Sequence, residues 1–268
     1  MSSIKEFKSK EINNHIVKWL TDYATNAKVK GFVVGISGGI DSAVTSTLCA
    51  QTGFPTLCVE MPIHQAPSHV SRGREHIEQL KKRFTNVSNI EADLTPVFDT
   101  FSKQVPVTDN KHLQDLTLAN TRARLRMTTL YYFAGINSAL VAGTGNKVED
   151  FGVGFFTKYG DGGVDVSPIA DLLKSEVREL AKFLQVPDSI VNAKPTDGLF
   201  GDDRSDEDQL GASYDELEWA MDEVEKGSKA DDFNGREQEV FNIYLKLNKA
   251  NKHKMVAIPV CEIPNNLK

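Results

Sequence analysis

The chain has 268 residues, 40% of them hydrophobic, which is enough to bury one substantial core. Its formal net charge is -6 and its basic residues form no stripe, so the composition does not indicate a nucleic-acid-binding surface. No run of about 18 apolar residues is present, and the N-terminus has no apolar segment of signal-peptide length, so neither membrane insertion nor secretion is indicated.

The first elements in chain order predict a parallel sheet. Apolar residues recur at helical spacing between Ile12 and Tyr23, which predicts an amphipathic helix within residues 1–28. Four short apolar, β-branched runs then alternate with helical patterns. These predicted strands cover residues 31–36, 55–60, 87–92 and 138–143. Such alternation is typical of a doubly wound α/β fold, a parallel sheet with helices on both faces.

The second half of the chain predicts helices and loops. A glycine-rich stretch follows the fourth strand, and then a helix with apolar positions Val177, Leu180, Phe183 and Leu184. Residues 197–211 are strongly acidic and predict either a surface loop or a lid that orders over ligand. Two more helices are expected near 214–225 and 236–250. We interpret 1–268 as a single domain, with a core over 31–254 and a tail over 255–268.

The three cysteines, Cys49, Cys58 and Cys261, lack the close pairing of zinc sites and redox motifs. We interpret them as reduced core thiols, because buried free cysteine behaves as a small hydrophobic residue. Together with the absence of a signal segment, this predicts a cytoplasmic protein.

The most informative segment joins the first predicted strand to a helix through the loop SGGIDS, residues 37–42. Two glycines let the backbone approach an anion, while serine hydroxyls and the free amides of a helix N-terminus can donate to it. Asp41 would repel phosphate, and a bound magnesium ion resolves this conflict. The loop is neither a Walker motif nor a GxGxxG fingerprint. The alternative without a ligand is a strand-to-helix turn in which serine and glycine only cap the helix.

SGGIDS resembles the pyrophosphate loop of the ATP pyrophosphatase family, which includes ammonia-dependent NAD synthetases, GMP synthetases, asparagine synthetases and tRNA-modifying enzymes. Further segments resemble the NAD synthetases in particular and follow one another in that family's order. They are NTRARLRM at 120–127, GTGNKVED at 143–150, GFFTKYGDGGVDVSP at 154–168, KPTDGL at 194–199, and the later strings SDEDQLG and NKHK.

The resemblance implies an ATP site and a magnesium site. It assigns Asp41 and Glu149 to Mg²⁺, and Glu149 follows the fourth predicted strand closely enough to lie near the carboxyl ends of the strands, where ligands of such sheets bind. The implied ATP ligands are Gly35, Ile36, Ser37, Gly38, Gly39, Ile40, Asp41, Ser42, Thr144, Lys174 and Thr196. On their own, Glu149 would be a common helix-dipole partner and Lys174 a common surface residue.

The resemblance also implies a site for deamido-NAD. The matching residues are Arg124, Lys158, Asp165, His253 and Lys254. Arginine suits phosphate or carboxylate groups, and aspartate suits ribose hydroxyls. Alternate residues such as Arg122, Arg124 and Arg126 do not share one helical face, so we expect at most two of them to reach a ligand.

The implied reaction is amidation of a carboxylate at the expense of ATP. The nicotinate carboxylate attacks the α-phosphorus, magnesium pyrophosphate leaves, and ammonia displaces AMP from the mixed anhydride. We expect Asp41 and Lys174 to support the first step. We interpret Asp161, in the GDGG segment, as the group that receives or positions the ammonium proton.

The family also suggests partners and alternatives. Its active sites lie at a homodimer interface, which implies a homodimer here. The N-terminal helix and the helix around 120–133 are candidate contacts, with packing inside one chain as the equal alternative. Only 36 residues precede Ser37, so we expect no glutaminase domain and expect free ammonia or a separate amidotransferase as the nitrogen source. Departures include GTGN for GTDH and TDGL for TADL. A tRNA-modifying enzyme, a GMP-synthetase-like enzyme and a noncatalytic nucleotide-binding module are the competing interpretations.

Overall fold

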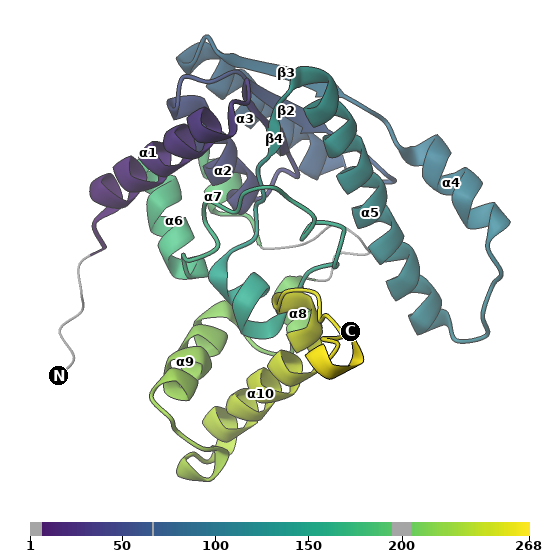
Figure 1. The fold of residues 1–268 in the computed structure, drawn as a ribbon. Coiled ribbons are helices and arrows are strands. Elements are labelled where there is room, and N and C mark those ends of the chain that lie inside the picture. The colour runs from purple at the N-terminus through teal and green to yellow at the C-terminus, as the bar shows by residue number, and fades with distance from the viewer. Residues whose placement is uncertain (1–6, 66, 195–204) are drawn as a thin grey trace.

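A computed structural model describes residues 7–65, 67–194 and 205–268. Four parallel strands form one sheet in the order β3-β2-β1-β4 (Figure 1). The strands are β1 (Phe32–Gly35), β2 (Thr56–Glu60), β3 (Val87–Glu91) and β4 (Leu140–Val141). All four lie within the ranges predicted from the sequence. β4 is shorter than expected, but Ala142 continues its edge through an isolated parallel bridge to Val166.

Helices fill the connections between strands and build the C-terminal part of the chain (Figure 1). The α-helices are α1 (Ser9–Ala27), α2 (Ile40–Gln51), α3 (Pro67–Arg83), α4 (Thr95–Gln104), α5 (Lys111–Asn137), α6 (Lys174–Phe183), α7 (Asp188–Val191), α8 (Asp206–Leu210), α9 (Tyr214–Glu225) and α10 (Gly235–Met255). A π-helix, η1 (Val148–Val153), and two 3₁₀ turns, η2 (Ala230–Asp232) and η3 (Asn265–Leu267), complete the chain.

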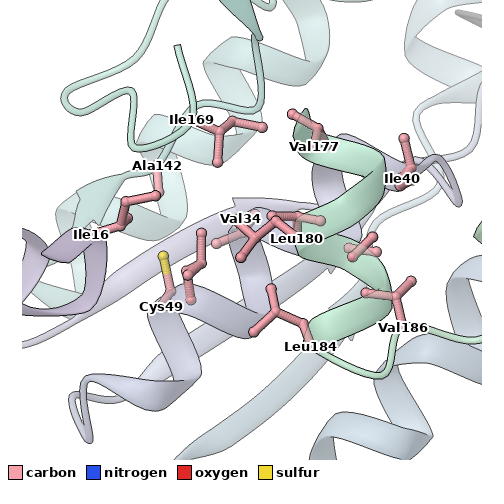
Figure 2. Close-up of a cluster of buried hydrophobic side chains, with 14 of the residues drawn as sticks. Ile16, Val34, Ile40, Cys49, Ala142, Ile169, Val177, Leu180, Leu184 and Val186 are labelled. Atoms are coloured by element: carbon pink, nitrogen blue, oxygen red, sulfur yellow. The ribbon is translucent and has the colours of Figure 1, made fainter. Parts of the chain in front are cut away.

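The side chains of β1 alternate between two hydrophobic clusters, as the pleat of a strand requires. Phe32 and Val34 join a large cluster with residues of α1, α2, α3 and α6, and Figure 2 shows Val34 beside Leu180 of α6. Val33 points to the opposite face and packs in a second cluster with Ala134 of α5. Helices therefore cover both faces of the sheet, and the predicted doubly wound α/β fold is confirmed.

A third hydrophobic cluster lies away from the sheet and joins η1 to α9 and α10 (Figure 1). Its largest fully buried side chains are Tyr214 and Phe241. Val148 and Val153 of the π-helix pack into it, so this helical layer holds the segment that follows β4.

One expectation about buried residues is wrong. Cys261 is exposed in the C-terminal segment, whereas Cys49 and Cys58 are buried free thiols as expected. Of the apolar positions predicted for the helix after the glycine-rich stretch, Val177, Leu180 and Leu184 are buried, while Phe183 is 44% exposed. Within the described residues, no helix combines the length and the apolar character needed to cross a membrane.

The buried His76 of α3 predicts a pH-dependent stability. Ser46 Oγ donates to the carbonyl of Ser42, so His76 Nε2 donates to Ser46 Oγ. Among the described residues, Nδ1 of His76 has no hydrogen-bond partner. Burial first, and then the charge of Arg83, lowers the pKa of His76 to about 4. Between pH 6.5 and 4 the unfolded chain therefore binds a proton that the native state does not, and the free energy of unfolding falls as pH falls through this window.

We predict that His76→Gln loses part of this pH dependence. At pH 5 the difference between the unfolded and folded pKa values corresponds to up to about 2 kcal/mol. Thermal melts at pH 7 and pH 5 should show a smaller drop in Tm for the variant than for the wild type. Exposed His15→Gln serves as the control and should follow the wild type. Equal drops in all three proteins would contradict the assignment.

Candidate active site

The loop between β1 and α2 builds an open anion cradle. Gly38 has a φ of +81°, in the left-handed region that favours glycine. Ser37 Oγ accepts from the amide of Gly39 at 3.1 Å, and Ser42 Oγ donates to the carbonyl of Gly39 at 2.9 Å. Gly39 provides no side-chain cap for α2, so the first amides of that helix have no partner within the helix. These amides suit an incoming phosphate.

The central feature of the site is a buried lysine shared by two carboxylates. Lys174 Nζ lies 2.5 Å from Asp41 Oδ2 and 3.1 Å from Glu149 Oε1. The side chain of Lys174 is 4% exposed, and those of Asp41 and Glu149 are each 17% exposed. The structure therefore brings together three residues that the sequence assigned to ATP and metal binding.

The charges in this triad shift one another's ionisation. Burial alone would lower the pKa of Lys174, but the two carboxylates outweigh burial and raise it, so the ammonium stays charged. Burial raises the pKa of Asp41 despite the attraction of Lys174, and Glu149 adds to the rise. The three groups together carry one excess negative charge, which favours a further cation.

Local structure explains how each member of the triad is held. Asn146 donates through Nδ2 to Asp41 Oδ1, and its Oδ1 accepts from the amides of Val148 and Glu149 at the start of η1. Such π-helical turns are frequent at functional sites. At the start of α6, Glu218 of α9 accepts from the amide and the hydroxyl of Ser175, next to Lys174.

The residues present fit a magnesium ion. Within the described part of the chain, no group of three or more His, Cys, Asp or Glu side chains could hold a metal ion. Magnesium does not need such a cluster, because it is usually held by only one or two carboxylates, with waters and substrate phosphates as its other ligands. Asp41 and Glu149 face the anion cradle and supply such a pair.

A cleft of about 250 Å³ opens beside the triad. It is lined by all the predicted loop residues from Gly35 to Ser42, by Thr144, and by the triad. Thr196 lies outside the described residues. Asp161 also lines the cleft. Desolvation by the surrounding protein, and to a lesser extent the negative charge of Glu149, raises the pKa of Asp161 to about 6.

The residues predicted for deamido-NAD lie close to this cleft but do not line it. Arg124 donates to the carbonyl of Lys158, and Lys158 Nζ donates to the carbonyl of His253. Lys254 Nζ donates to the carbonyl of Phe156. Asp165 instead accepts from Tyr131 and from the amide of Val141 in β4. Three of the five residues thus form one connected group, while Asp165 stabilises the edge of the sheet.

Sequence reasoning missed several residues of the site. Arg126 lines the cleft and donates to the carbonyl of Met61, while Arg122 stacks on Phe98, so the three arginines of this run do point in different directions. Arg72 lines the cleft and donates to the carbonyl of Gly38. A fourth carboxyl, Asp150, is half-buried, and desolvation followed by the charge of Glu149 raises its pKa to about 7. Among these residues, only Arg126 had a sequence signal, namely its place in the run of alternate arginines at 122, 124 and 126.

The family model described as NAD synthase matches residues 12–257 of this chain. The chain belongs to the NAD synthase family. It is 42% identical over 212 residues to the NH(3)-dependent NAD(+) synthetase of Mesoplasma florum, covering 78% of this chain and 83% of that relative. It is 35% identical over 261 residues to the enzyme of that name from Methanocaldococcus jannaschii, covering 94% and 97%.

A solved structure described as NMN synthetase from Francisella tularensis resembles this NAD synthase family member with a TM-score of 0.80. The sequences are 33% identical, and the match covers 97% of this chain and 100% of the other. Members of this family form a carbon–nitrogen bond, so the chain is a ligase. The sequence-based assignment to the family is confirmed.

Lys174→Met should destabilise this family member strongly. Removing the ammonium leaves two largely buried carboxylates without their counter-ion, a change that typically costs about 3–5 kcal/mol. Urea unfolding at pH 7 without magnesium should show this loss, and added Mg²⁺ should recover more stability in the variant than in the wild type.

The control for Lys174→Met is Lys182→Met on the same helix. Lys182 pairs with Glu179 at the surface, where an ion pair contributes about 0–1 kcal/mol. Equal stability of the two variants would contradict the role of Lys174 as the counter-ion of the site.

Proposed function

We propose that this protein catalyses the ATP-dependent amidation of deamido-NAD by ammonia, giving NAD, AMP and pyrophosphate. The observation that carries the proposal is the position of Lys174 between Asp41 and Glu149 beside the SGGIDS loop. The names of the curated relatives support the choice of ammonia and of NAD as the product.

The residues of the site have separable roles in this proposal. The loop amides and the hydroxyls of Ser37 and Ser42 bind the β- and γ-phosphates, and Lys174 neutralises charge that develops on the leaving group. Asp41 and Glu149 hold Mg²⁺. When bound, the ion would polarise the phosphates and neutralise the leaving pyrophosphate.

Asp161 is the proposed acceptor of the ammonium proton. Its carboxylate faces the same cleft as the triad and accepts a hydrogen bond from the amide of Thr157 at 2.9 Å. Its raised pKa, about 6, brings it closer to neutral pH than an ordinary aspartate, which suits a general base.

A shorter acceptor is the second candidate substrate. The Francisella structure is described as an NMN synthetase, and nicotinate mononucleotide carries the same carboxylate as deamido-NAD without the AMP half. The chemistry at Asp41, Lys174 and Asp161 would be identical. The two substrates differ only in whether a site for the second nucleotide half is used, and the connected group of Arg124, Lys158 and His253 is our candidate for that site.

The test is an amidation assay with purified protein, ATP, Mg²⁺, ammonium and either acceptor, with product amide quantified by chromatography. We expect NAD from deamido-NAD with a kcat/KM well above that for the mononucleotide. Asp41→Asn should lose at least about 100-fold in kcat, because it loses both a metal ligand and the partner of Lys174. Asp161→Asn should release pyrophosphate while forming less amide.

The outcomes of this assay separate the two candidate substrates and test the role of Asp161. Preference for the mononucleotide would establish the second candidate. No amide from either acceptor would remove the proposed function. Unchanged amide formation by Asp161→Asn would remove Asp161 from the mechanism.

We also propose that two chains form a homodimer through α5, in the cytoplasm of the cell. Tyr132 and Ile136 lie one turn apart on α5, and each is 63% exposed. Large apolar side chains on one helix suit an interface better than solvent. Light scattering after size exclusion should give twice the chain mass, and Ile136→Glu should reduce it. A monomeric wild type at micromolar concentration would contradict the dimer.

A further inference from the structure

Tyr214, the first residue of α9, lies against the triad and was not found by sequence reasoning. It is fully buried, and its hydroxyl lies 2.6 Å from Glu149 Oε1. The same hydroxyl oxygen is 3.4 Å from Asp206 Oδ2, at the start of α8. Lys174 Nζ lies 4.7 Å from the centre of the tyrosine ring. One side chain therefore contacts the ammonium and one of the two carboxylates that we assign to the metal.

The hydroxyl acts as a donor to Glu149. Burial, with the nearby carboxylates, raises the pKa of Tyr214, so the phenol keeps its proton. Tyr214 and Lys174 both bind Oε1 of Glu149. Within the described residues, Oε2 of Glu149 has no hydrogen bond. The carboxylate is thus held by one oxygen, which leaves the other for a cation.

The backbone around Tyr214 is fixed on both sides. The amide of Tyr214 donates to Glu207 Oε1 of α8, and Ser213 and Glu216 cap the start of α9 through reciprocal hydrogen bonds. Farther along the same helix, Glu218 binds Ser175 beside Lys174. The helix that carries the hydroxyl is therefore also hydrogen-bonded to the residue next to the lysine.

The geometry points to Tyr214 as a positioning residue that orients Glu149 for the metal ion, with Oε1 engaged by the phenol and Oε2 presented to the cation. This inference rests on the proposal that Glu149 binds Mg²⁺. A tyrosine at this place does more than fill the third cluster, because phenylalanine would fill the same volume and make the same ring contact with Lys174.

The test compares Tyr214→Phe with Tyr244→Phe. Tyr244 is also buried in the third cluster, but among the described residues its hydroxyl bonds none of the carboxylates of the site, so it controls for loss of a buried hydroxyl. ATP binding is measured by calorimetry over a magnesium series, and Mn²⁺ binding by electron paramagnetic resonance. Neither measurement requires turnover.

In Tyr214→Phe we expect the Mg²⁺ concentration that gives half of the full metal effect on ATP binding to rise about five- to tenfold. The Kd for Mn²⁺ should rise by the same factor, which is the loss typical of one hydrogen bond. ATP binding without metal should not change, and Tyr244→Phe should match the wild type. In the amidation assay kcat at fixed low Mg²⁺ should fall and recover at high Mg²⁺.

Three results would overturn the inference. These are wild-type metal dependence in Tyr214→Phe, an equal shift in Tyr244→Phe, or ATP binding by the wild type that does not depend on metal. A wild type that binds metal and ATP normally but forms no amide would instead sink the proposed function and leave the role of Tyr214 standing.

Discussion

The buried ammonium of Lys174 is the interaction on which the site depends. Asp41 and Glu149 come from segments more than 100 residues apart, and like charges so close in a buried place require a counter-ion. A buried ion pair stabilises a protein only if its geometry is good and its remaining polar atoms are satisfied. Asn146 and Tyr214 satisfy oxygens of the two carboxylates, which explains why both are buried beside them.

The sheet topology explains where these groups meet. β2 and β3 lie on one side of β1, whereas β4 lies on the other, so the strand order reverses between β1 and β4. Ligands of open α/β sheets bind outside the carboxyl ends of the strands at such a point. The anion cradle follows β1 and the π-helix follows β4, so Asp41 and Glu149 arise from the two neighbouring strands. α6 packs against α2 in the large cluster that contains Val34 (Figure 2). Its first residue, Lys174, lies between Asp41 and Glu149.

The parts of this structure that depend on local chemistry could be predicted from the sequence. The strand pattern and the SGGIDS loop are each encoded within a few residues. Glu149 and Lys174 could be assigned only through the family resemblance, because an isolated glutamate in a first helical turn usually complements the helix dipole and an isolated lysine at a helix start is usually solvated. Tyr214 and Asn146 could not be found, since their partners lie 65 and 105 residues away in the sequence. Cys261 was wrongly placed in the core.

We propose that this triad and loop direct cleavage of ATP between its α- and β-phosphates. Phosphorus NMR of a reaction with ATP, Mg²⁺, ammonium and deamido-NAD reports the products directly. We expect equal amounts of AMP and pyrophosphate, with no signal from ADP. The appearance of ADP and inorganic phosphate would mean that the γ-phosphate is transferred instead, and would contradict the roles assigned to Asp41, Glu149 and Lys174.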